Sequence, residues 1–300
     1  MTDNAIGTPG IPRGEAGLWQ AIAAQGRVLV ALILREIRTR HGNTVFGYLQ
    51  DLMEMPIILL AMLLMFTLTG RQSPYGDNIA LFLITGVLPF YMVKKTATKG
   101  MGSVKRAGTF KRMMPVTPLD TGIAAMTVNF LTYTLILLGF LGVLAAFKFS
   151  SDAIPYAPQR VIEGFGVAMI FTYGLGIING VVSFFAPTWT FIFGLLMRPM
   201  IFTSGIFYIP EEMPRAMIDI IKWNPLLHII AWIRTGFYET YPTFILDRSF
   251  AVTVAIGTLL FGLTLDRAAR RRFGRSRGRN RRAFDGARLR RGTGVPLHRD

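Results

Sequence analysis

The sequence predicts an all-α membrane protein with six transmembrane helices. Hydrophobic residues make up 51% of the 300 positions, and the mean hydropathy is +0.42. These residues come in long blocks, and a helix needs about 20 mostly apolar residues to cross a hydrocarbon layer about 30 Å thick. Basic residues gather at both ends of the chain and in one loop, which is typical of a multi-pass membrane protein.

Six blocks meet the length of a membrane span and define a membrane domain over residues 45–266. They are Val45–Thr69, Ile79–Met101, Leu119–Phe147, Val161–Phe185, Trp189–Ile209 and Phe244–Leu265. The second block is the least sharply bounded, because its continuous apolar run ends at Val93 and three lysines follow. Lysine side chains can reach along a helix toward the headgroups, so the helix can continue past Val93.

The distribution of positive charge predicts the orientation of the chain. Three regions supply most of the net charge of +16: residues 13–40, residues 94–112 and the arginines of residues 267–299. Cytoplasmic loops carry an excess of Lys and Arg, so we expect all three regions, and with them both termini, in the cytoplasm. The remaining loops are balanced or acidic. The chain before the first block shows no cleavable signal pattern.

An amphipathic helix is expected before the first span, over residues 16–44, after a flexible N-terminus of residues 1–15. Its apolar stripe consists of Leu18, Ile22, Leu29, Ile33 and Ile37. A single stripe of this kind, with arginines beside it, predicts a helix that lies in the membrane interface.

Two carboxylates, Asp51 and Glu54, stand three residues apart near the start of the first span. One interpretation, which we favour, is that they occupy the positive end of the helix dipole and pair with nearby arginines. The other is that they belong to a cytoplasmic gate or contact a partner subunit.

Arg198 lies in the middle of the fifth predicted span, about ten residues from either end. An arginine at that depth costs on the order of 3 kcal/mol on insertion scales. Such a cost indicates one of two environments. Arg198 faces a water-filled path, or it forms a buried pair or helix-cap interaction beside Pro199. The sequence leaves both alternatives open.

The remaining polar residues exclude several kinds of site. The chain has no cysteines, so it has no disulfides and no thiolate metal ligands. The histidines, His41, His228 and His298, are too far apart in the predicted topology for a metal site, and we expect His228 to be packed at an interface. The basic tail, residues 267–300, is interpreted as a topology anchor attracted to anionic lipid rather than to nucleic acid, and its GRSRGRNRR stretch is expected to lack regular structure.

Three stretches resemble the permeases of polysaccharide-exporting ABC transporters, the ABC-2-type permeases of capsular polysaccharide exporters. LREIRTRHGNTVFGYLQDLMEMP (34–56) is similar to the REI-TR-G, GYLW and acidic-Pro pattern that opens those chains. VTPLDT (116–121) is similar to a VKPLDT-like stretch of the capsular branch. SGIFYIPEEMP followed by WNPLLHIIAWIR resembles the loop before the last span. Gln50 and Thr117 depart from the family, where Trp and Lys are usual.

The resemblance implies a half-transporter that forms a homodimer and works with two copies of a separate ABC ATPase. It implies re-entrant outer helices in residues 210–243 and a coupling loop over residues 103–118. The implied coupling residues are Lys105, Arg106, Phe110, Lys111 and Arg112, and the implied gate or partner contacts are Arg35, Glu36, Arg40, Asp51 and Glu54. No G-x-x-x-x-G-K-[ST] phosphate loop occurs, so ATP and Mg are used by the partner and we expect no cofactor on this chain.

The implied cargo is a lipid-linked, anionic polysaccharide that crosses the bacterial inner membrane. Further implied partners are membrane lipids and periplasmic and outer-membrane export proteins. Aromatic rings suit a sliding glycan because they offer broad faces and, in Tyr and Trp, a hydrogen-bonding end. The expected pathway residues are Arg198, Trp189, Phe193, Phe202, Phe207, Tyr208 and Trp232. Each ring also suits ordinary packing or an interface belt.

Other functions are weaker interpretations of the same residues. An ABC permease for O-antigen, teichoic acid, a lipid or a drug is the closest alternative, and VTPLDT favours capsule over these. A membrane-embedded glycan enzyme would need an acid, base or metal constellation, and the only carboxylate cluster in or beside the spans is Asp51 with Glu54. A purely structural scaffold would not require a coupling loop. We therefore expect a transporter subunit with no catalytic residues.

Overall fold

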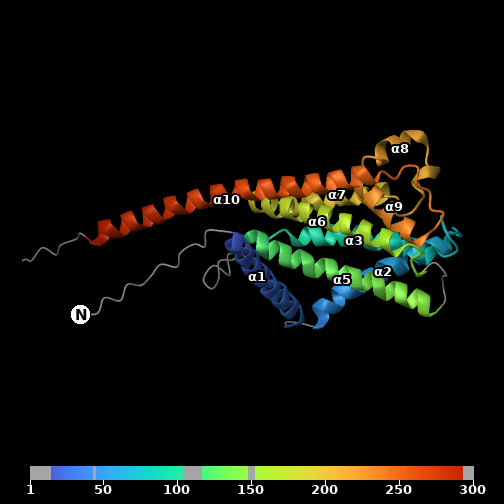
Figure 1. Cartoon of the computed structure of the whole chain (residues 1–300), viewed down its shortest axis with the longest axis horizontal. Coiled ribbons are helices and arrows are strands. Elements are labelled where there is room, and N and C mark those ends of the chain that lie inside the picture. Colours follow the sequence, from blue (N-terminus) through green and yellow to red (C-terminus); the bar gives the residue numbers. More distant parts are fainter. Residues whose placement is uncertain (1–14, 43–44, 104–116, 148–152, 293–300) are drawn as a thin grey trace, which may run out of the picture.

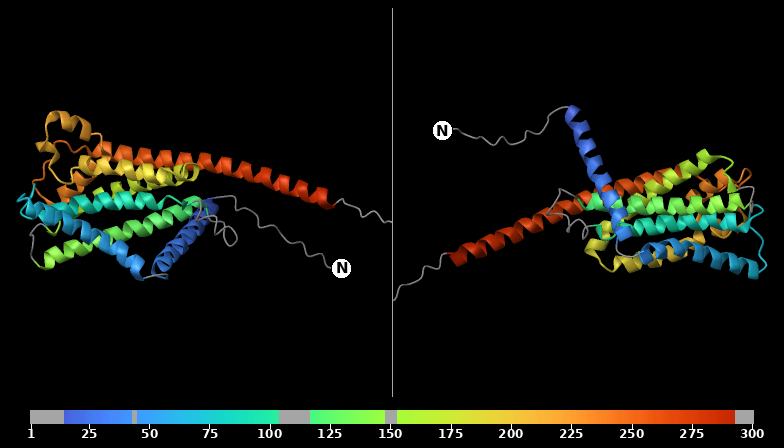
Figure 2. Two further views of the ribbon diagram at one scale, coloured as in Figure 1. Left: turned by 180° about the vertical axis from the view of Figure 1, so that it is seen from behind. Right: turned by 90° about the horizontal axis from the view of Figure 1, so that it is seen from below.

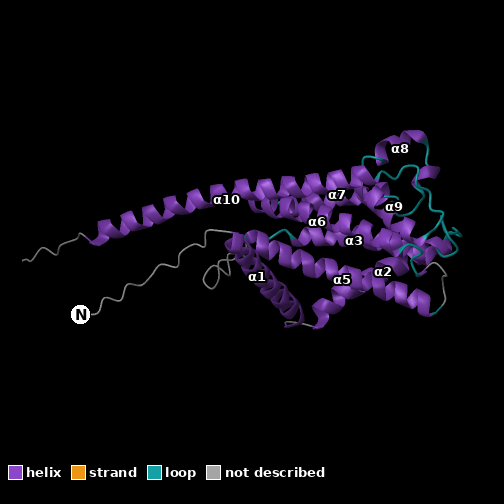
Figure 3. Ribbon diagram, viewed as in Figure 1, coloured by secondary structure: helices purple, strands orange, loops and turns teal. Residues whose placement is uncertain are grey.

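The computed structural model describes residues 15–42, 45–103, 117–147 and 153–292, and this part of the chain is helical without strands (Figures 1 and 3). Side chains are described within residues 20, 23–39, 53–103, 117–147 and 153–270. The helices are α1 (Glu15–Gly42), α2 (Val45–Leu68), α3 (Ile79–Lys99), α5 (Pro118–Ala146), α6 (Pro158–Phe185), α7 (Trp189–Thr203), η2 (Pro210–Glu212), α8 (Arg215–Ile221), α9 (Pro225–Phe237) and α10 (Arg248–Gly292). The predicted all-α class is confirmed.

Helices α3, α5, α6 and residues 248–270 of α10 are long and apolar enough to cross a membrane. Helices α8 and α9, joined at an angle of 99°, form a fifth candidate, with the geometry of a broken span or a re-entrant loop. Residues 53–68 of α2 and all of α7 are shorter apolar helices. The described residues thus provide four to five candidate spans, and the predicted count of six stays a prediction.

Three predicted boundaries are wrong. The fifth block was expected to run to Ile209, but α7 ends at Thr203, and Gly205 then takes a left-handed backbone conformation with φ of 67°. The last helix begins at Arg248 rather than Phe244. It also continues to Gly292, through the stretch expected to be irregular, because arginine is a good helix former and no proline interrupts it. The second helix does continue past Val93, to Lys99.

The bundle has two ends, which we name by the helices found there. The α9 end carries α8, α9 and the start of α3, and the α1 end carries the last residues of α3 and the start of α5 (Figure 1). α1 crosses the bundle at an angle, and α10 extends well beyond it at the α1 end (Figure 2). The basic ends of α3 and of the described part of α10 therefore lie at the same end as α1.

Helix α3 is the centre of the fold, since it packs against α5, α6, α9, α2 and α7. Nearly all of its side chains from Leu81 to Val93 are buried. Glycines permit two close backbone crossings: a Cβ on Gly100 would lie 2.0 Å from the carbonyl oxygen of Gly176, and one on Gly174 would lie 2.6 Å from the amide nitrogen of Leu259. These positions bring α3 and α10 against α6 without intervening side chains.

Residues 117–121 of the VTPLDT stretch form the N-cap and first turn of α5. Thr117 caps the helix: its backbone N–H donates to Asp120 Oδ2 at 2.9 Å, and its side chain accepts from the Asp120 N–H in a capping box. Gln25 of α1 donates to Asp120 Oδ1 at 2.6 Å, and Arg270 of α10 donates to Thr117 Oγ1 at 3.3 Å. This capping box therefore joins α1, α5 and α10 at the α1 end.

Helix α1 (Glu15–Gly42) occupies the region where the amphipathic helix, residues 16–44, is expected. Leu29 and Ile33 of the predicted stripe pack with Leu32 against Ala124 of α5. Its position at a membrane surface stays a prediction. Asn224 caps α9, since its side chain accepts the Leu226 N–H and Pro225 is the first helical residue.

Arg234 of α9 is almost fully buried at the α9 end, with 1% of its surface exposed. Its guanidinium donates to the carbonyl oxygens of Gly205 at 2.6 Å, Ile206 at 3.0 Å and Phe82 at 3.2 Å, and to the Tyr241 hydroxyl at 3.3 Å. It also lies 3.8 Å from the centre of the Phe82 ring. Several acceptors and a ring face offset the loss of water around the buried cation.

We expect Arg234→Met to destabilise the protein strongly, because it leaves several buried acceptors without a donor, each costing about 1–3 kcal/mol. The melting temperature in detergent should fall on the order of 10 °C. Arg234→Lys should also lower it, since an ammonium cannot span the same acceptors. The exposed Arg215→Met is the control. Equal melting temperatures for the Arg234→Met and Arg215→Met proteins would contradict this role.

Candidate functional site

Helix α7 presents one exposed face that carries a cation between apolar side chains. Phe191, Leu195, Arg198 and Phe202 recur at spacings of four, three and four residues, which places them on one side of a helix. Phe191 is 70% and Phe202 65% exposed in the single chain. We call these four residues the α7 face.

The opposite side of α7 attaches the helix to the bundle. Phe193 and Met197 pack against Ala97 and Met101 near the end of α3. Trp189 donates from Nε1 to Asn179 Oδ1 of α6 at 2.8 Å. Phe193 is therefore buried and Trp189 partly buried in the protomer, and their expected pathway roles stay predictions.

Arg198 is closer to the end of its helix than the sequence predicted, because α7 stops at Thr203, five residues beyond it. Its side chain is exposed, and within the described residues it has no hydrogen bond or ion pair. The alternative of a buried pair or cap beside Pro199 thus receives no support. An exposed cation on an otherwise apolar helix favours a water-filled path at this face.

A second group of charges lies near Arg198, on α3 and α2. Arg198 is near enough to Lys94 for the two charges to interact. Lys94 Nζ also lies 5.3 Å from the centre of the Tyr91 ring. The adjacent Lys95 forms an ion pair with Glu54 of α2, at 2.5 Å between Nζ and Oε1. Three cations and one described carboxylate thus gather where α2, α3 and α7 approach each other, and this arrangement can attract an anion.

The helix-dipole interpretation of Glu54 is wrong. α2 begins at Val45, so its first turn holds no acidic residue and Glu54 lies nine residues into the helix. Its charge is instead neutralised by Lys95 from the next helix. A gate or partner role for Glu54 stays a prediction, and the Asp51 side chain lies outside the described residues.

The other predicted gate and coupling residues are placed only in part. Arg35 and Glu36 lie on α1, with Arg35 exposed and Glu36 partly exposed. Arg40 belongs to the same helix, but its side chain is not described. The coupling residues Lys105, Arg106, Phe110, Lys111 and Arg112 lie outside the described residues.

Three predicted pathway aromatics, Phe202, Phe207 and Tyr208, do come together at the end of α7 and in the turn that follows it. Phe202 and Phe207 have ring centres 6.1 Å apart, and Phe207 also lies 6.4 Å from Phe66 of α2. The Tyr208 hydroxyl donates to the Phe202 carbonyl oxygen at 2.8 Å, which closes the turn. This aromatic cluster lies toward the α9 end, beyond Arg198 along the α7 face.

Trp232, the last predicted pathway residue, is only 7% exposed. Its Nε1 donates to Glu163 of α6 at 3.3 Å, and the Arg248 guanidinium lies 5.2 Å from the centre of its ring. In this structure Trp232 serves packing between α9, α6 and α10. His228 is likewise packed, as expected, with Nε2 bonded to the Lys222 carbonyl oxygen at 2.7 Å.

The sequence did not identify Arg234 as a buried cation, nor Lys94 and Lys95 as members of the charge group near Arg198. Arg234 stands in an outer segment of balanced charge, and nothing in the sequence marks it as buried. The second predicted block, Ile79–Met101, includes Lys94 and Lys95, but their position beside Arg198 and Glu54 depends on the packing of α7 and α2 against α3, which no local pattern reveals.

These features define the class of protein, a helical integral membrane protein that exposes one cation, Arg198, and two aromatic rings on an apolar helix. The chain belongs to the ABC-2 type transporter family, whose pattern matches residues 27–238. Members of this family are transporter subunits rather than enzymes.

Named relatives align over most of the chain. It is 28% identical to the polysialic acid transport protein KpsM of Escherichia coli over 239 residues, 79% of this chain and 91% of that protein. It is 25% identical to the capsule polysaccharide export inner-membrane protein BexB of Haemophilus influenzae, over 82% of this chain and 92% of that protein. It is 26% identical to the O-antigen export system permease protein RfbA of Klebsiella pneumoniae, over 68% of this chain and 78% of that protein.

Glu211, at the α9 end outside the spans, provides a pH-dependent test of the structure. Its Oε1 accepts the Ile245 N–H at 3.3 Å, and burial raises the pKa of its carboxyl group. A raised pKa in the folded state means that ionised Glu211 destabilises the fold at neutral pH, and that this penalty disappears as the pH falls through the raised pKa toward the ordinary value.

Glu211→Gln should therefore raise the melting temperature at pH 7.5, and the difference from the unmodified protein should shrink as the pH is lowered. The exposed neighbour gives a matched control, Glu212→Gln, which should change little. A Glu211→Gln difference that stays constant over the pH range would contradict the assignment.

Proposed function

We propose that this chain is the permease subunit of an ATP-driven exporter that moves a capsule-type, lipid-linked and anionic polysaccharide across the bacterial inner membrane. The observation that carries the proposal is similarity over nearly the whole length of capsule export proteins, together with family membership. The cations Lys94 and Arg198 and the aromatic cluster supply the chemistry that an anionic glycan requires.

The proposed assembly is a homodimer with two ABC ATPase subunits, which bind ATP and Mg. The α1 end faces the cytoplasm in this proposal. Support comes from the positive charge there, since α1, the Lys94–Lys99 end of α3 and the Arg267–Arg270 turn of α10 lie at one end of the bundle (Figure 1). Helices α8 and α9 are then the re-entrant helices of the opposite, outer end.

Export of O-antigen is the second candidate, because the Klebsiella O-antigen permease also aligns with this chain. That alignment covers less of both proteins than the capsule alignments do. Analysis of the surface glycan in a strain that lacks this chain distinguishes the two: loss of capsule with intact O-antigen supports the proposal, and the reverse supports the alternative.

Arg198→Ala should reduce surface glycan several-fold at normal protein levels, because the exposed cation that attracts the anionic cargo is lost. Arg198→Lys keeps the charge and should retain most export. Arg215→Ala removes an exposed arginine away from the α7 face and serves as the control. Surface and intracellular glycan are measured in a complemented deletion strain, and unchanged export by Arg198→Ala would remove the residue from the pathway.

The double substitution Lys111→Ala and Arg112→Ala should uncouple ATP hydrolysis from export, since these residues are expected to contact the ATPase. The measurement compares ATPase rate and glycan transport in a reconstituted complex. Transport per ATP should fall several-fold, while the complex still forms. An unchanged ratio would place the coupling contact elsewhere in the chain.

A further inference from the structure

The position of Arg198 depends on how α7 is held, and among the described helices α7 packs closely against α6 and α3. Beyond its last turn, the Asn224 amide of the α9 cap donates to the Thr203 hydroxyl at 2.9 Å. At its start, Trp189 donates from Nε1 to Asn179 Oδ1 of α6 at 2.8 Å. Each end of α7 is thus bonded to an asparagine side chain from another segment.

The Asn179 amide joins three helices. Its Oδ1 accepts the indole N–H of Trp189 on α7, and its Nδ2 donates to the Ala97 carbonyl oxygen of α3 at 3.3 Å. Only 1% of the Asn179 surface is exposed. An indole N–H can only donate and a carbonyl oxygen can only accept, so a flipped amide would lose both bonds. The orientation of the Asn179 amide is therefore fixed by partners on both sides.

The helices behind Asn179 leave no room for adjustment. Gly176 and Gly180 flank it on α6, and both lie against the end of α3. A Cβ on Gly180 would lie 2.8 Å from the Gly100 carbonyl oxygen, and one on Gly100 would lie 2.0 Å from the Gly176 carbonyl oxygen. Because α3 and α6 meet here backbone to backbone, α7 is the helix whose position the amide decides.

The place of Trp189 on α7 also determines the direction of Arg198. The two residues are nine apart, and nine steps of about 100° bring Arg198 to the side of the helix opposite Trp189. Phe193 and Met197, which lie between them in sequence, are buried against the end of α3. A rotation of α7 that broke the Trp189 bond would therefore move Arg198 as well.

The same amide is bonded close to the second cation. Ala97 lies three residues after Lys94 on α3, within one helical turn. Asn179 therefore ties the turn that carries Lys94 to the helix that carries Arg198. We propose that Asn179 is a positioning residue that sets where Arg198 stands relative to Lys94. The inference rests on the proposed function, in which both cations attract the anionic cargo, and Trp189 then acts through Arg198 rather than by contact with the glycan.

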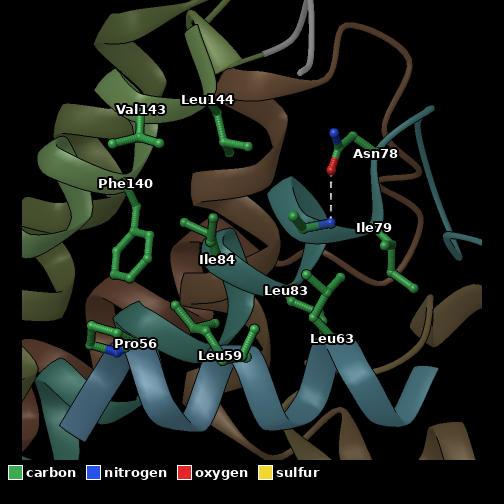
Figure 4. A pocket seen from close by; sticks show the side chains of 12 residues that line it. Pro56, Leu59, Leu63, Asn78, Ile79, Leu83, Ile84, Phe140, Val143 and Leu144 are labelled. Carbon is green, nitrogen blue, oxygen red and sulfur yellow. Dashed lines mark hydrogen bonds between the residues drawn. The ribbon is translucent and has the colours of Figure 1, made fainter. Parts of the chain in front are cut away.

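A cavity of about 580 Å³ between α2, α3 and α5 takes no part in this arrangement (Figure 4). The polar side chain in its lining is Asn78, whose Oδ1 accepts the Ala80 N–H at 2.8 Å at the start of α3. That turn belongs to the α9 end, whereas Ala97 lies in the last turn of α3, at the α1 end. The placement of α7 by Asn179 is therefore independent of what fills this cavity.

Two substitutions separate positioning from stability. Trp189→Phe keeps an aromatic ring but leaves Asn179 Oδ1 without this donor. Adding Asn179→Leu removes both polar partners, and the Ala97 carbonyl oxygen still accepts the Gly100 N–H at 3.3 Å. This double variant should regain most of the melting temperature that Trp189→Phe loses, because no buried acceptor is left without its donor.

Export should not recover with stability. Surface glycan at equal protein levels should stay reduced several-fold in both Trp189→Phe and the double variant, because neither fixes the start of α7. Recovery of export together with the melting temperature would show that Asn179 serves packing alone, and it would overturn the proposal.

The loss of export should also pass through Arg198. In an Arg198→Ala background the double variant should reduce export no further, because the misplaced cation is already absent. A further several-fold loss in that background would overturn the proposal.

A spectroscopic measurement tests the positioning without the cargo. The sequence has no cysteines, so Arg198→Cys introduces a single thiol for a nitroxide label. In the purified full-length protein, adding the double variant should shorten the rotational correlation time of this label about twofold, because the start of α7 is released. Trp189→Phe alone gives the same comparison if the double variant folds poorly.

Asn129→Leu combined with Thr96→Val is the matched control. It removes another buried polar pair of α3, in which Asn129 Nδ2 of α5 donates to Thr96 Oγ1 at 3.0 Å, and the label should keep its correlation time. An unchanged label in the double variant, or an equal change in the control, would overturn the proposal. A released label together with full export by Arg198→Ala would instead support the positioning and refute the use of Arg198 in the proposed function.

Discussion

The arrangement at the α9 end depends on one buried cation. Arg234 binds the carbonyl oxygens at the exit of α7 and near the start of α3, and it reaches the Tyr241 hydroxyl before α10. Three segments, around Phe82, Gly205 and Tyr241, are thereby fixed to one planar group. Gly86 allows this approach, because a Cβ there would lie 2.6 Å from Nη2. The turn after α7, and so the place where the α7 face ends, is set by the same contacts.

The α1 end is organised differently, by a helix cap rather than a buried charge. Asp120 accepts hydrogen bonds from Thr117 and Gln25, and Arg270 joins the same group. The chain that precedes Thr117 is the expected coupling loop, so a force applied there acts directly on a cap shared by α1, α5 and α10. Between the two ends, glycine contacts keep α3, α6 and α10 close.

The sequence predicted what depends on local composition. Long apolar blocks located the helices, because this signal acts within a short stretch of sequence. The end of α7 was missed because Gly205 and the Arg234 contacts, rather than hydropathy, stop the helix. The role of Glu54 was misjudged because its partner, Lys95, lies on another helix. The aromatic predictions divided in the same way: Phe202, Phe207 and Tyr208 gather in space, while burial of Phe193 and Trp232 follows from packing partners that no local pattern reveals.

Helix α10 runs without interruption from Arg248 to Gly292, about 68 Å at 1.5 Å per residue. That is more than twice the thickness of a hydrocarbon layer. Its first part packs along α6, and Asp266 and Arg270 form an ion pair one turn apart where the helix passes the start of α5. Beyond Arg270 the remaining 22 residues extend about 33 Å, so a tilt of about 5° about the contact with the start of α5 would displace the far end by about 3 Å. Small rearrangements where α10 passes the start of α5 are therefore magnified at the far end of the helix.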